Sequence, residues 1–267
     1  MTIPADRSRS GEAIESLRPS EVPFDAPWKW LDFGWRDLWA APTAGLTFGA
    51  IAALGALLIA AALAKFRALP MLLPLTGGFL LIGPLLAVGL YEVSRRRELG
   101  QTATLGDSVR AATRATGRLA LFGVLLLIIY LAWVRIAFLL FMLFFGTNAL
   151  PPLPEFVPTL LFTAHGLGLL VTGTAIGAVL AMLTFAISAI AVPLLFDRPV
   201  DPITASVISV QAVILNPKAM ILWAALIAAA VLLGAVTLFL GLVVSFPLLG
   251  HATWHAYRDL LSNKDHS

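Results

Sequence analysis

Long apolar runs are the feature that most limits how this chain of 267 residues can fold. Runs of about 20 apolar residues recur along it, and this is the length that an α-helix needs to cross the hydrocarbon core of a bilayer. Hydrophobic residues make up 59% of the chain and charged residues only 12%, far too few polar groups to cover a soluble domain. The sequence therefore predicts an all-α fold, a polytopic membrane helical bundle.

The apolar runs predict about six transmembrane helices. The first four spans are expected at roughly 43–64, 70–94, 118–145 and within 159–196. The fourth run is too long for one ordinary crossing, so it is expected to tilt, to kink or to begin with a short helix that does not span. Residues 218–258 are almost continuously apolar, and one helix of that length would overshoot a core of roughly 30 Å about twofold. We therefore expect two spans there, with a turn near Gly234 to Gly241.

The positive charges indicate which way these spans run. With six spans, fifteen Lys and Arg residues lie on the side that holds both chain ends, and only Lys65 and Arg67 lie on the other side. Cytoplasmic loops of membrane proteins carry an excess of Lys and Arg. Both termini are therefore expected in the cytoplasm.

The chain ends differ in composition from the rest. Residues 1–26 mix both charge signs with Pro and Ser and lack the apolar core of a signal peptide, which predicts a disordered cytoplasmic tail. Residues 27–260 are expected to form a single transmembrane domain, and residues 261–267 a second cytoplasmic tail.

Internal repetition is a further feature of the sequence. The string PLL occurs near the end of each even-numbered span, starting at Pro84, Pro193 and Pro247. In a gapless alignment of the first and third copies, Tyr91 falls on Trp254. An amphipathic stretch precedes each odd-numbered span: GWRDLWAAP, LGDSVRAATRATG and ITASVISVQAVILNP. In the second stretch, Thr104 followed by Asp107 predicts a helix N-terminus. The sequence predicts three parallel repeats of an interfacial helix plus a transmembrane hairpin, at roughly 27–98, 103–198 and 201–260.

Aromatic residues and arginine at the expected helix ends are typical of interfacial anchors. The stretch WKWLDFGWRDLWAAP predicts an amphipathic helix with indole rings at headgroup depth, and an aromatic ligand site is the alternative. The expected anchors are Trp28, Trp35, Trp39, Tyr91, Trp254 and Arg258.

The stretch HATWHAYRDL carries His251 and His255 on one face of a helix. We favour the end of a span that meets the headgroups. Two alternatives stay open, a metal or haem site and a proton or headgroup contact. A metal site would need more ligands than these two histidines.

Three further polar residues are candidates for a function within the membrane. Arg135 lies within span three, where a charge is costly, so it is expected to snorkel outward and pair with Glu155. A role for Arg135 in a substrate or ion pathway is the alternative. Glu92 and His165 are the other candidates for a polar path.

Ordinary catalytic and cofactor patterns are missing from the sequence. The chain has no cysteine, which excludes disulfides and thiolate metal sites, and it has no HExxH, GxSxG or Walker motif. We therefore expect neither enzyme activity nor a cofactor. The arginine-rich helix at 105–118 is expected to meet anionic lipid headgroups of the bilayer, and a nucleic-acid partner is not expected.

The motifs WKWLDFGWRDLWAAP, GGFLLIGPLLAVGLYEVSRRRELG and GHATWHAYRDL together resemble a family of uncharacterised bacterial integral membrane proteins, domain of unknown function 2189. The resemblance covers roughly 28–260 and implies a bacterial inner-membrane protein with about six spans. It implies no activity. Some members have been labelled cytochrome oxidase subunits, but a haem–copper subunit needs several histidines inside its spans, and only His165 comes close to that here.

Two classes of function remain. The first, which we favour, is a non-enzymatic membrane component: a scaffold, an assembly partner of another membrane protein or a lipid-organising protein. The second is a small-solute channel or transporter with a polar path formed by Arg135, His165, Thr172, Thr174, Thr184, Ser188 and Glu92. A haem- or metal-binding respiratory accessory protein is less favoured, because it depends on His251 and His255 alone.

Overall fold

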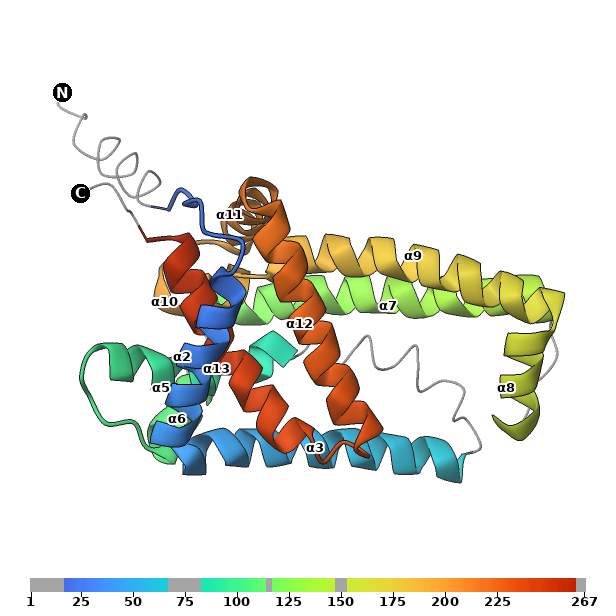
Figure 1. The fold of residues 1–267 in the computed structure, drawn as a ribbon, viewed down its shortest axis with the longest axis horizontal. Helices are drawn as coiled ribbons and strands as arrows, with labels where there is room; N and C mark the ends of the chain where they lie inside the picture. Colours follow the sequence, from blue (N-terminus) through green and yellow to red (C-terminus); the bar gives the residue numbers. More distant parts are fainter. Residues whose placement is uncertain (1–16, 67–82, 114–116, 147–152, 263–267) are drawn as a thin grey trace.

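The computed structural model describes residues 17–66, 83–113, 117–146 and 153–262, and its regular elements within these ranges are all α-helices (Figure 1). The predicted all-α class is therefore confirmed. The helices are α2 Ala26–Ala40, α3 Pro42–Lys65, α5 Val88–Glu98, α6 Leu105–Thr113, α7 Gly117–Phe145, α8 Leu153–Phe162, α9 Ala164–Ser188, α10 Ala191–Asp197, α11 Pro202–Leu215, α12 Pro217–Val236 and α13 Leu242–Leu260.

Proline and short polar side chains mark where several helices begin. Pro42 and Pro217 stand in the first turn of α3 and α12, where a missing amide N–H costs no hydrogen bond. At the start of α6, the Thr104 hydroxyl accepts from the Asp107 amide, and the Asp107 carboxylate accepts from the Thr104 amide, both at 3.2 Å. The helix N-terminus predicted from this pair is confirmed.

Four helices of the described ranges are long and apolar enough to cross a membrane. They are Pro42–Lys65, Gly117–Phe145, Ala164–Asp197 and Pro217–Val236. The first two match the predicted spans one and three. The long fourth run is divided, because α8 ends at Phe162 and the Thr163 hydroxyl caps α9 by accepting from the Gly166 amide at 3.1 Å. Most of predicted span two lies outside the described residues.

The turn predicted near Gly234 to Gly241 is present, since α12 ends at Val236 and α13 begins at Leu242. Leu238 and Phe239 adopt positive φ angles of 52° and 66°, which is uncommon for residues with a side chain. Although α13 follows this turn as predicted span six would, it is not one of the four helices apolar enough to cross, because its second half carries His251, His255, Arg258 and Asp259.

Several helices come together at one end of the molecule. Figure 1 shows α7 and α9 side by side along the long axis and α3 on the opposite side, with α2, α5, α6 and α10 together at the same end as the second half of α13. We call this region the converging end. In and beside it, α6 packs on α5, α11 packs on α9 and α10, and α2 packs on α13.

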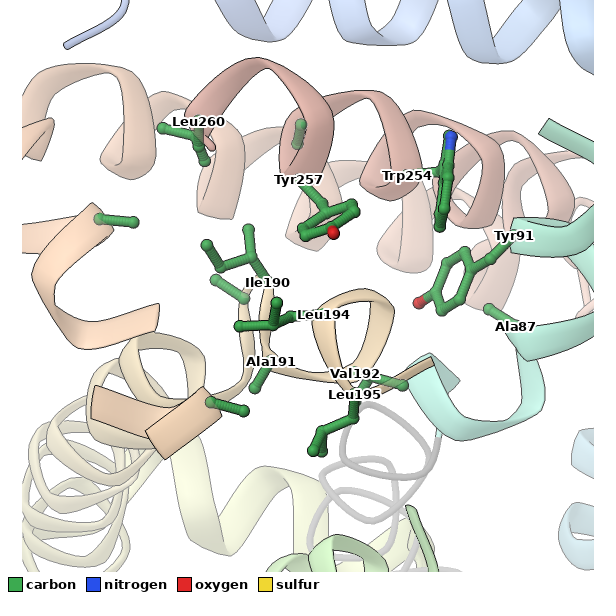
Figure 2. Packing of buried hydrophobic residues seen from close by; sticks show 14 of the residues in the cluster. Ala87, Tyr91, Ile190, Ala191, Val192, Leu194, Leu195, Trp254, Tyr257 and Leu260 are labelled. Carbon is green, nitrogen blue, oxygen red and sulfur yellow. The ribbon is translucent and has the colours of Figure 1, made fainter. Parts of the chain in front are cut away.

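Aromatic side chains from three helices form the core of the converging end. Tyr91 of α5, Phe196 of α10 and Trp254 of α13 lie with ring centroids 6.2–6.5 Å apart. Figure 2 shows Tyr91 and Trp254 facing one another above Leu194. Tyr91 and Trp254 are each only 1% exposed, so their rings contact other side chains. Their expected role as headgroup anchors stays a prediction.

The described part of the N-terminal tail is held against the helices and is not disordered as predicted. The Ser20 amide donates to the Leu260 carbonyl at 2.8 Å, and the Val22 amide donates to Oδ1 of Asn216 at 2.8 Å. Leu17 is buried. These hydrogen bonds satisfy backbone groups that a free tail would leave to water, so the ordered part of the chain begins before residue 27. Residues 1–16 of the predicted tail and residues 263–267 lie outside the described residues.

Candidate functional site

The three arginines in the last turn of α5 bind three carboxylates between them. Arg95, Arg96 and Arg97 stand in the last turn, where positive charge also complements the carbonyl end of the helix. Arg95 holds Glu92 through Nε at 2.8 Å and Nη2 at 3.0 Å. Arg96 reaches Glu92 at 2.7 Å and Asp107 of α6 at 3.0 Å. Arg97 reaches Asp37 of α2 at 2.6 Å.

The first part of the site is the Asp37 cluster, which consists of Asp37, Ser94, Arg97, His251 and His255. The Asp37 side chain is only 8% exposed, and its second oxygen accepts from Nε2 of His255 at 2.8 Å. This carboxylate therefore joins α2, α5 and α13. Burial alone would raise the pKa of Asp37, but the hydrogen bonds from His255 and Ser94 and the nearby histidines lower it below its ordinary value of 3.8.

The two histidines of α13 have different surroundings. His251 is fully buried, with Nδ1 at 2.9 Å from the Ser94 hydroxyl, and its Nε2 has no hydrogen-bond partner. Nδ1 of His255 lies 3.9 Å from Glu98. Within the described ranges, no group of three or more His, Asp and Glu side chains could hold a metal ion. The arrangement binds helices together, and Ser94 and Asp37 already take one nitrogen of each ring.

The second part of the site is the arginine cavity, a hollow of about 410 Å³ between α5, α6, α7 and α10. Glu92 is buried at one side of it. The cavity is lined by Glu92, Arg95, Arg96, Asp107, Arg110, Ala111, Arg118, Leu119, Leu195, Phe196 and Asp197. A volume of this order suits a small ligand or a headgroup.

The other polar candidates lie far from these two clusters along the chain and do not pair as expected. Arg135 is exposed on α7, and no ion pair joins it to Glu155 within the part of the chain that the structure describes. The predicted Arg135–Glu155 pair is therefore not formed. His165 is exposed at the start of α9.

The remaining anchor candidates lie at the surface. Trp28, Trp35 and Trp39 are all exposed on α2, with Trp35 and Trp39 in edge contact at 5.5 Å. Arg258 is half exposed and pairs with Glu98 at 3.2 Å. Their exposure is compatible with the predicted role at the headgroups.

Sequence reasoning missed Asp37 and Ser94 as members of a buried cluster. A signal for Asp37 is present in the spacing, because Trp30, Gly34, Asp37 and Leu38 recur at helical intervals and all four are buried. Asp37 therefore belongs to the packed face of α2 rather than to its polar face. Ser94 carries no comparable signal.

Residues 71–197 match a family model described as "Predicted integral membrane protein (DUF2189)". Over these residues, somewhat less than half of the chain, it is similar to the DUF2189 family. It is thus an integral membrane protein, in agreement with the resemblance stated above, although the match is narrower than 28–260 and contains only the second of the three motifs. No curated protein and no solved structure matches the chain. All residues that line the arginine cavity lie within the DUF2189 region.

Proposed function

We propose that this chain is a non-enzymatic scaffold of the bacterial inner membrane that organises lipid, and other membrane proteins, around its converging end. The proposal rests on the way in which its buried charged side chains are paired. Asp37 of α2 bonds Arg97 of α5 and His255 of α13, and Arg96 of α5 bonds Asp107 of α6, so that these side chains lock helices together. Groups fixed in this way suit a rigid platform better than a catalytic site, which needs a group free to react.

The proposed scaffold consists of three parallel repeats arranged as a ring. In each repeat an interfacial helix (α2, α6 or α11) precedes a span. Each of these helices packs on the last helix of the preceding repeat, and α2 of the first repeat packs on α13 of the third. The meeting of Tyr91, Phe196 and Trp254, one from each repeat, further supports this arrangement.

The proposed scaffold has six spans, with both termini in the cytoplasm. The first and last described segments meet at the converging end, where the Ser20 hydroxyl donates to the Ser262 carbonyl at 2.6 Å, and the arginine-rich end of α5 lies there too. Clustered arginines favour the cytoplasmic side. The exposed tryptophans of α2 would then lie at the headgroups of that leaflet.

A flux assay separates this proposal from a channel or transporter. The purified chain is reconstituted in liposomes, and potassium, proton and small-solute flux is compared with that of protein-free liposomes. We expect no excess flux, partly because the Thr184 and Ser188 hydroxyls donate to carbonyls of their own helix at 2.7 Å and do not face a path. Flux above the protein-free level, reduced by Arg135→Gln, would show a transporter instead.

An absorption spectrum and a metal analysis of the same preparation test the remaining alternative. A stoichiometric haem band or bound metal that disappears in His251→Ala or His255→Ala would replace the scaffold by a redox or metal protein. The scaffold requires neither.

A further inference from the structure

The arginine cavity is lined by charged side chains, and the ion pairs that hold the helices together do not account for all of them. Four arginines and three carboxylates line it, which leaves one net positive charge. Glu92 is taken by Arg95 and Arg96, and Asp107 by Arg96 at 3.0 Å. Asp197 accepts from the Tyr257 hydroxyl at 2.6 Å. Every carboxylate of the cavity is therefore engaged already.

Arg110 and Arg118 are the arginines of the cavity that no carboxylate holds by a hydrogen bond in the described ranges. Arg110 is 67% exposed and lies 3.7 Å from Asp107, beyond hydrogen-bond distance. Arg118 donates from Nη1 to the carbonyl of Arg198 at 3.2 Å and has no ion pair with a carboxylate in the described ranges. Two guanidinium groups with free donors at one cavity are suited to a phosphate group, whose oxygens match their forked geometry.

The position of the cavity indicates where that phosphate would come from. Arg118 is the second residue of α7, and Asp197 is the last residue of the apolar stretch Ala164–Asp197. If these two helices cross the bilayer, as the proposed function requires, the cavity lies where their ends leave the hydrocarbon. This is the depth of lipid phosphates.

An apolar path leads from the cavity along α7. Leu121, Leu125 and Ile128 follow Arg118 at intervals of three, seven and ten residues, so they share its helix face, and all three are exposed. Leu119, Leu195 and Phe196 make part of the cavity wall apolar. A soluble phosphate would leave this path empty, whereas the acyl chain of a lipid would cover it.

We propose that the arginine cavity binds the phosphate of an anionic phospholipid headgroup through Arg110 and Arg118, with an acyl chain of that lipid along α7. The inference rests on the proposed function for the orientation of α7 in the bilayer. It names the lipid class that the scaffold would hold: a phospholipid with a net negative charge, in preference to a zwitterionic one.

Native mass spectrometry of the full-length, delipidated protein tests the site. The protein is titrated with phosphatidylglycerol, with phosphatidylcholine and, separately, with inorganic phosphate in competition. We expect one tightly bound phosphatidylglycerol and weaker phosphatidylcholine. The double variant Arg110→Gln/Arg118→Gln should bind phosphatidylglycerol about tenfold more weakly, the effect of losing one charged hydrogen bond or more.

Two further variants make the result interpretable. Arg36→Gln removes an exposed arginine of α2 that pairs with Asp32 outside the cavity, and it should bind phosphatidylglycerol like the natural chain. Arg110→Gln alone changes a mostly exposed side chain, so it should leave the fold intact and still weaken binding. Equal binding by the natural chain and the double variant, or an equal loss in Arg36→Gln, would overturn the site.

The source of the phosphate is decided by the competition. Displacement of the lipid by inorganic phosphate at equal concentration would mean that the acyl chain adds nothing, and the lipid assignment would fail. Failure of the lipid site would leave the scaffold proposal intact, since that proposal depends on the separate liposome flux assay.

Discussion

Oδ1 of Asp37 lies 2.6 Å from Nη1 of Arg97, although the two residues are 60 positions apart in the chain. The same carboxylate bonds His255, which is 218 positions away. One buried side chain therefore holds together the first helix, the arginine-rich helix and the last helix that the structure describes. Removing its charge should weaken both contacts at once.

Asp37→Asn is expected to destabilise the folded protein by about 3 kcal/mol, because Arg97 and His255 would keep their places beside a buried group without charge. The measurement is thermal unfolding in detergent followed by circular dichroism. Asp32→Asn is the matched control on the same helix. Its carboxylate is exposed and pairs with Arg36 at 2.7 Å, so its loss should cost less than about 1 kcal/mol. Equal effects of the two substitutions would contradict the structural role of Asp37.

The contribution of Asp37 should also depend on pH. Because its pKa in the folded protein lies below 3.8, the charged form is favoured by folding. The stabilisation is therefore fully present above 3.8 and is lost as the pH falls through the lower pKa of the folded state. The unfolding temperatures of the natural chain and of Asp37→Asn should differ at about pH 6 and approach each other as the pH falls through the lowered pKa of Asp37. A difference that stays constant over this range would show that the carboxylate charge is not the stabilising feature.

Gly34 is expected to tolerate no larger residue, because α2 and α13 touch there through their backbones. A Cβ atom at Gly34 would lie 2.8 Å from the Ala252 nitrogen and 2.9 Å from the Leu248 oxygen. Gly34→Ala should therefore push α2 away from α13 and cost about 1–3 kcal/mol in unfolding free energy. Gly55 of α3 meets nothing within 4 Å, so Gly55→Ala should be neutral or slightly stabilising in the same assay. A stabilising Gly34→Ala would mean that the two helices are not in close contact.

The proposed orientation can be tested with single cysteines, since the natural chain has none. Gln101 lies exposed between α5 and α6, and Glu155 lies exposed in α8. In cells with a permeable outer membrane, an impermeant maleimide should label Glu155→Cys at once. It should label Gln101→Cys only after the inner membrane is opened. The reverse pattern would invert the topology, and equal labelling of the intact cells would mean that α7 does not separate the two positions.

Features that depend on neighbours in the sequence could be predicted, and features that depend on distant partners could not. The Thr104–Asp107 cap and the break between α12 and α13 follow from local spacing and from helix length. The environment of Trp254 does not, because an aromatic residue near a helix end fits either a headgroup layer or a core. Only the packing of α5, α10 and α13 decides between these environments, and it buries Trp254. The order of residues 17–25 likewise depends on Asn216 and Leu260, which no local pattern connects to them.

The pairing of α2 with α13 has a consequence for biosynthesis. Nε1 of Trp30 donates to Asp259 at 3.0 Å across 229 positions, so this partner of α2 is synthesised long after α2 itself. Until α13 is synthesised, α2 lacks its main packing partner, and its exposed tryptophans suit it to lie at the membrane surface. The contact between α2 and α13 forms only after Leu260 has been synthesised, and a chain truncated before α13 would leave the packing face of α2 open to proteases.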